Sequence, residues 1–88
     1  MAHVFYPAVL FEPDDTGWWG VTVPGINVNA QGESREAALT EAAVILQEVI
    51  DDLTAAGRDV PEPGTLDDPD YDEGTAVMLH AAKPELAA

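Results

Sequence analysis

The segment from Val4 to Glu12 constrains the fold most, because it resembles a strand whose even-numbered and odd-numbered positions both carry apolar residues. Its β-branched and aromatic residues are typical of β-strands. Successive side chains of a strand point to opposite faces of a sheet, so both faces of this strand must be covered. One predicted face carries Val4, Tyr6, Ala8 and Leu10, and the other carries Phe5, Val9 and Phe11.

A second strand is predicted from Trp18 to Val23, after the turn-forming residues 13–17. Proline fixes φ, aspartate favours turns and glycine tolerates positive φ, so Pro13-Asp14-Asp15-Thr16-Gly17 predicts the turn of a hairpin. We expect Pro7 to interrupt the first strand. A short third strand is predicted over Ile26–Ala30, followed by a turn at residues 31–33.

A long helix is predicted from about Arg35 to Ala56. Ser34 is a good N-cap, and Gly57 stands where a left-handed C-terminal residue belongs. The segment 60–74 has the composition of a linker, and Thr75–Ala81 predicts a last strand. Apolar spacings of three and four define the helix stripe, which comprises Leu39, Ala42, Ala43, Leu46, Val49, Ile50 and Leu53, and which Val44 and Ile45 widen.

This order predicts an α+β fold, in which a small antiparallel sheet (β-β-β-α-β) carries one long helix on one face. We expect a single domain over residues 1–82 and a tail over residues 83–88. One helix covers only one face of the sheet. The other apolar face must therefore meet the linker, a second copy of the chain or a partner.

The charge balance is strongly acidic, with 17 acidic residues against three basic ones and a formal net charge of −14. Such a field repels nucleic acid and anionic membranes and attracts basic proteins. Simple solubility is an equally good explanation of the same charge. The chain has no cysteine, and no apolar run approaches the roughly 20 residues that span a bilayer. We expect a cytoplasmic protein of bacterial type, with no membrane partner and no direct nucleic-acid partner.

The acidic clusters and the two histidines are the candidate chemical sites of this sequence. The clusters lie in turn-like sequence rather than on a rigid frame, so we expect no metal and no cofactor. His3 and His80 are possible general bases, but the sequence places no catalytic partner beside either, so we expect no enzyme activity. The clusters are Glu12, Asp14 and Asp15, and Asp67, Asp68, Asp70, Asp72 and Glu73.

Trp18 and Trp19 point to opposite faces because they are adjacent in a strand. Trp19 shares its parity with Val21 and Val23, which predicts a core position. Trp18 is the candidate binding anchor, because tryptophan is enriched at interface hot spots. We predict that Glu12, Asp14, Asp15 and Trp18 contact a partner, and that Val44 and Ile45 mediate self-association.

Six motifs follow one another over about residues 6–63, namely Tyr6-Pro7-Ala8-Val9, a turn ending in Gly17, Val23-Pro24, Gln31-Gly32-Glu33-Ser34, Glu36-Ala37-Ala38-Leu39 and Gly57-Arg58-Asp59-Val60-Pro61-Glu62-Pro63. In this order, they make the chain resemble the HicB antitoxin family. Pro24–Ala30 is shorter than the usual loop of that family and lacks its cysteine. Many members add a C-terminal DNA-binding segment, which we do not expect here because few residues follow the last predicted strand.

The resemblance implies a partial RNase H-like sheet without catalytic acids. It also implies that the chain binds HicA, a small basic RNA-cleaving toxin, and masks the active site of that toxin. Assembly into dimers or tetramers is a further implication. Three functions follow as hypotheses. The first is an antitoxin-like binder of such a toxin. The second is a solitary HicB-like domain that self-associates without a toxin, and the third is a metal-dependent nuclease.

Overall fold

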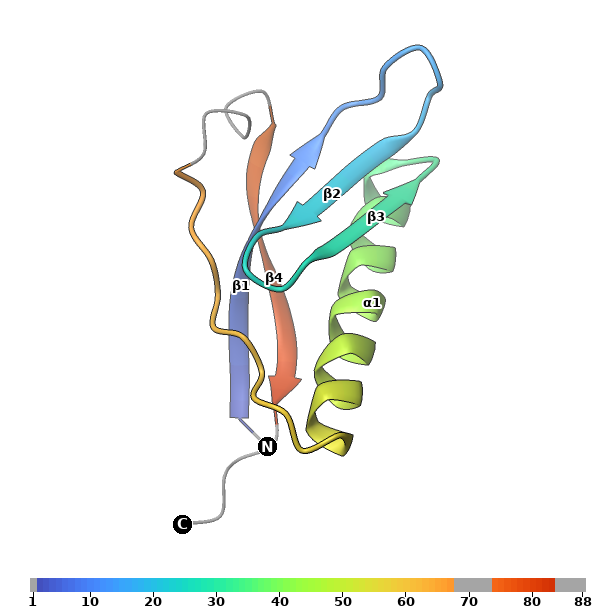
Figure 1. Cartoon of the computed structure of the whole chain (residues 1–88). Coiled ribbons are helices and arrows are strands. Elements are labelled where there is room, and N and C mark those ends of the chain that lie inside the picture. The colour runs from blue at the N-terminus through green and yellow to red at the C-terminus, as the bar shows by residue number, and fades with distance from the viewer. Residues whose placement is uncertain (1, 68–73, 84–88) are drawn as a thin grey trace.

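A computed structural model describes residues 2–67 and 74–83, which form one sheet and one helix (Figure 1). The elements are β1 (Ala2–Phe11), β2 (Trp19–Val23), β3 (Val28–Gly32), α1 (Arg35–Ala55) and β4 (Thr75–Lys83). The sheet is antiparallel throughout, with the strand order β3-β2-β1-β4. The predicted fold class, with one long helix on one face, is confirmed.

The first strand is continuous through Pro7, so the expected interruption is wrong. β1 pairs with β4 along nearly its whole length, from Ala2 opposite Lys83 to Leu10 opposite Thr75. Its ladder with β2 begins only at Val9. Pro7 therefore lies where β1 has a strand on one side only, and a missing N–H group is tolerated at such an edge.

The third strand begins two residues later than predicted, and it includes Gln31 and Gly32, which were expected to form a turn. The reason lies in the turn before it. Gly25 and Asn27 both have positive φ, 90° and 62°, so the backbone is not extended there. Glycine and asparagine tolerate this left-handed region, which most residues avoid.

Helix α1 has the two ends that the sequence predicts. The Ser34 hydroxyl accepts a 3.0 Å hydrogen bond from the Ala37 N–H, and Gly57 follows the helix with φ 72°. The N–H of Arg58 bonds to the Leu53 carbonyl and that of Gly57 to the Thr54 carbonyl, which is the Schellman pattern. No helix in the described parts of the chain is long and apolar enough to cross a membrane.

The core lies between α1 and one face of the sheet. Ala38 is fully buried although it lies outside the predicted stripe, because Gly32 brings the end of β3 against the first turn of α1. A Cβ atom on Gly32 would collide with the backbone at Ala37 and Ala38. The buried residues of this core are Tyr6, Ala8, Leu10, Val21, Val23, Ile26, Val28, Ala30, Ala38, Ala42, Leu46, Ile50, Leu79 and Ala81, and Trp19 packs against them as predicted.

The opposite face of the sheet is only partly covered. Val9 is 1% exposed, and a Cβ atom on Gly74 would collide with its side chain, so the chain's own backbone covers this point. Phe5 and Met78 remain 56% and 60% exposed. They occupy the part of the sheet where β1 pairs with β4 alone. The expected second apolar face is therefore present, and it is open at Phe5 and Met78.

The segment after α1 runs back along the sheet (Figure 1). The Tyr6 hydroxyl donates a 2.6 Å hydrogen bond to the Pro61 carbonyl. Gly64 then packs against Pro24 and Gly25 so closely that neither glycine has room for a Cβ atom. Of the predicted linker, residues 68–73 lie outside the described residues, as do residues 84–88 of the predicted tail.

Candidate partner-binding surface

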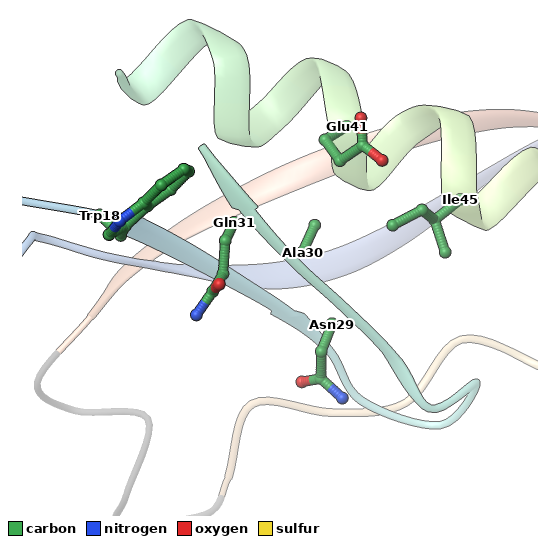
Figure 2. Close-up of a pocket in the computed structure, with 6 residues that line it drawn as sticks. All are labelled: Trp18, Asn29, Ala30, Gln31, Glu41 and Ile45. Carbon is green, nitrogen blue, oxygen red and sulfur yellow. The ribbon is translucent and has the colours of Figure 1, made fainter. Parts of the chain in front are cut away.

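A hollow of about 460 Å³ lies where the outer edge of β3 meets α1 (Figure 2). Trp18, just before β2, stands at one end of it, and Ile45 of α1 at the other. Trp18 is 46% exposed. Six residues line the hollow, namely Trp18, Asn29, Ala30, Gln31, Glu41 and Ile45.

The turn before β2 holds the backbone that presents Trp18. The Asp14 carboxylate accepts hydrogen bonds from the Thr16 N–H at 2.9 Å and from the Thr16 hydroxyl at 2.7 Å. The Trp18 N–H donates to the same hydroxyl at 3.3 Å, and the Gly17 N–H bonds to the Asp14 carbonyl. The hydrogen bonds from Thr16 stabilise the ionised carboxylate and so lower the pKa of Asp14. The bond from the Thr16 N–H has the larger effect, and the bond from the Thr16 hydroxyl comes second. Asp14 therefore orders the segment that carries Trp18.

The helix contributes an apolar and an acidic side chain to the hollow. Ile45 is half-buried and packs partly on the core, whereas Glu41 is exposed. They are four residues apart, so they are neighbours on one face of α1. Val44 and Glu48 lie on the same outer face, and Val44 is 48% exposed. This face thus presents apolar side chains between carboxylates.

Strand β3 forms one border of the sheet. Its only strand neighbour among the described residues is β2, so the opposite side of its backbone meets no further strand. The side chains of Asn29 and Gln31 are exposed, and Ala30 between them is buried against α1. An edge of this kind can accept an added strand from a partner. The hollow therefore combines the exposed Trp18 and the half-buried Ile45 with polar side chains, beside a strand edge that meets no further strand among the described residues.

The structure places the predicted contact residues in different surroundings. Trp18 and Ile45 line the same hollow, although they were assigned to partner binding and to self-association respectively. Glu12 and Asp15 are exposed near the hairpin turn, and Val44 is exposed on the outer face of α1.

Sequence reasoning missed Glu41, Asn29, Ala30 and Gln31. Helical spacing from Ile45 could have indicated Glu41. The other three could not be found, because nothing local to β3 shows that it is the edge of the sheet.

His3 and His80 lie together on the face of the sheet opposite α1. From the sequence, each of them was expected to stand alone. No group of three or more histidine, aspartate or glutamate side chains within residues 2–67 and 74–83 could hold a metal ion. Of the second acidic cluster, Asp68, Asp70, Asp72 and Glu73 lie outside the described residues.

Comparisons with known proteins identify the fold. The N-terminal domain of the Burkholderia pseudomallei antitoxin HicB matches with a TM-score of 0.76 and 24% identity, over 94% of this chain and all of that domain. The chain spans 62% of the length of that antitoxin's full structure, with a TM-score of 0.70 and 24% identity over 90% of this chain.

Two toxin–antitoxin complexes contain the same fold. One, from Streptococcus pneumoniae, matches with a TM-score of 0.74 and 22% identity over 92% of this chain and 70% of that one. A HicA3–HicB3 complex matches with a TM-score of 0.64 and 18% identity, over 93% of this chain and all of that one. No protein-family model and no curated protein matches the sequence. The chain therefore has a HicB-like fold, shared with the N-terminal domain of HicB antitoxins.

Proposed function

We propose that this chain is an antitoxin-like binding protein that neutralises a small basic RNA-cleaving toxin of the HicA type by masking its active site. The observation that carries the proposal is the hollow at the edge of β3, where Trp18 and Ile45 offer apolar contacts. In the described part of the chain, no strand pairs with this edge. The role is one of binding rather than catalysis. The cytoplasmic location expected from the sequence remains a prediction.

Two further observations support a basic partner. The net charge is −14, and Glu41 and Glu48 flank the apolar residues on the outer face of α1. An acidic field speeds the encounter with a positively charged protein and disfavours nucleic acid as a direct ligand. Two structures that share the fold are described as toxin–antitoxin complexes.

The test is to find whether a small basic protein is encoded beside this chain and co-purifies with it, and then to titrate the isolated pair. Replacing Trp18 with alanine should weaken binding by about 2 kcal/mol or more, as expected for a tryptophan hot spot. Phe5→Ala is the matched control, because Phe5 is an exposed aromatic residue of similar exposure on a distant part of the sheet.

Equal loss of affinity in both variants would show that the hollow is not the binding surface. A neighbouring basic protein that neither binds nor is restrained in its RNA cleavage would remove the proposal itself. Cleavage of RNA by this chain alone, in the presence of Mg²⁺, would favour the nuclease hypothesis instead.

Self-association is a second candidate, favoured by the exposure of Val44 beside the half-buried Ile45. Two copies would bury these side chains between their α1 helices. Sedimentation equilibrium of the wild-type chain and of Val44→Glu would test it, because a charge at the centre of an apolar contact disrupts it. A monomeric wild-type chain would exclude this candidate, as would a variant that remains oligomeric.

A further inference from the structure

His3 and His80 face each other on the side of the sheet that α1 leaves uncovered. They are 77 positions apart in the chain, and the Nδ1 atom of His3 lies 2.6 Å from the Nε2 atom of His80. Both side chains are exposed. The β1–β4 ladder brings them together, because it sets His80 opposite Phe5, two residues beyond His3.

The two rings meet edge to edge. Their planes are inclined by 24°, and their centroids are 4.5 Å apart, well beyond the 2.6 Å between the facing nitrogens. The nitrogens therefore lie on the facing edges, where one donates a hydrogen bond to the other according to the tautomer. When both protons occupy the outer ring nitrogens, the facing nitrogens can both direct a lone pair at a shared ion. The ring of Phe5 packs against His80 at 5.2 Å and 44°, which limits the rotation of that imidazole.

We propose that His3 and His80 form a surface site for a divalent transition-metal ion of the zinc class, with His3 Nδ1 and His80 Nε2 as ligands and water completing the shell. Neutral imidazole is the commonest metal ligand in proteins. With a Zn–N distance near 2.0–2.1 Å, two nitrogens on a tetrahedral ion stand about 3.3 Å apart. Opening the pair to this distance requires a movement of less than about 1 Å at the tips of two exposed rings.

The surroundings favour such an ion over its competitors. A net charge of −14 concentrates cations around the molecule, including Mg²⁺ and Ca²⁺. Those ions prefer oxygen ligands, whereas imidazole suits zinc, copper and nickel. The nitrogen pair therefore selects by ligand type, although carboxylates are far more numerous in this chain.

Metal binding would also join the start of β1 to the end of β4. This is the half of β1 that pairs with one strand only and carries the exposed Phe5 and Met78. A ligand that binds only the folded state stabilises it. The proposal departs from the sequence-based expectation of no metal, which treated each histidine as isolated.

The experiment is calorimetric titration of the untagged full chain with ZnCl₂ at neutral pH, in an excess of MgCl₂ that occupies carboxylate sites. One zinc ion should bind per chain, and Zn²⁺ should raise the Tm. Removing a ligand should cost at least about tenfold in affinity, since even residues that only orient ligands cost that much. His3→Gln and His80→Gln should therefore each weaken zinc binding at least about tenfold, while the circular dichroism spectrum is unchanged. Glu12→Gln is the control, because it removes an exposed carboxylate and leaves the pair intact.

Three outcomes would overturn the site. Zinc binding that survives both histidine variants would assign the ion to carboxylates. Binding lost in His3→Gln and retained in His80→Gln would assign it to His3 with backbone groups near the N-terminus. The absence of heat and of any Tm shift in the wild-type chain would show that the pair is only a hydrogen bond. None of these results bears on toxin binding at the edge of β3, so the two proposals fail independently.

Discussion

The hydroxyl of Tyr6 donates a 2.6 Å hydrogen bond to the carbonyl of Pro61, which joins the middle of β1 to the segment that follows α1. Tyr6 is 1% exposed, and its ring lies in the core between the sheet and the helix. Two of the motifs that resemble the HicB family thus contact each other, one at the start of the chain and one after its helix. This contact fixes the course of the chain as it leaves α1.

Tyr6→Phe should lower the free energy of unfolding by about 1 kcal/mol, because it removes this hydrogen bond while the ring still fills the core. Urea denaturation followed by circular dichroism measures the change. Tyr6→Ala should cost about 3–5 kcal/mol, as for other buried aromatic side chains. A Tyr6→Phe variant as stable as the wild type would show that the Pro61 carbonyl is equally well satisfied by water.

Stability should fall at high pH because of the same residue. Burial, and then the nearby charge of Glu62, raise the pKa of Tyr6 above its ordinary value. The folded state therefore holds the Tyr6 proton more tightly than the unfolded state does. The contribution of this proton to the free energy of unfolding is complete below about pH 10, and it is lost as the pH rises through the pKa of Tyr6 in the folded state. Chemical denaturation across this range should show a decline that Tyr6→Phe abolishes. The same decline in the variant would assign it to another group.

Gly32→Ala should destabilise the fold by about 1–3 kcal/mol or more, because its methyl group meets the backbone of Ala37 and Ala38 with no room to relax. Gly20→Ala is the matched control. It lies in the adjacent strand with its nearest neighbour, the Phe11 Cβ atom, 4.0 Å from the added carbon. Thermal unfolding of both variants separates steric overlap from the general effect of replacing glycine. Similar Tm values for the two would contradict the close approach of β3 and α1.

Asp14→Ala should weaken partner binding more than Asp15→Ala. Both variants remove one exposed carboxylate, but only Asp14 accepts the hydrogen bonds that order the turn before Trp18. If charge alone attracts the partner, the two variants should lose affinity equally. Titration calorimetry with the basic partner distinguishes these cases, and the Asp14 variant should show the larger entropic penalty.

Any complex with a basic partner should weaken as ionic strength rises, because salt screens the field of a chain with net charge −14. The association rate should fall more than the dissociation rate rises, since steering acts on the encounter. Stopped-flow measurements at several salt concentrations test this. An affinity that does not change with salt would indicate an interface dominated by the apolar contacts of Trp18 and Ile45.

Much of the fold follows from signals that are local in the sequence. Helix α1 begins after Ser34 and ends before Gly57 because a hydroxyl caps the first turn and a glycine accepts positive φ at the last. The β1–β2 hairpin forms across its acidic, glycine-ended turn as predicted. In each case, the residues that decide the structure lie within a few positions of it.

The sheet order and the two candidate sites come from contacts between distant segments. The ladder of β1 with β4 joins residues more than 60 positions apart, and no local pattern specifies it. That ladder brings His3 to His80, and the position of β3 at the border brings Trp18 to Ile45. From sequence alone, Val4–Phe11 was known to need cover on two faces. Only the tertiary structure decided which apolar residues stay exposed, because burial depends on which segments pack together in space.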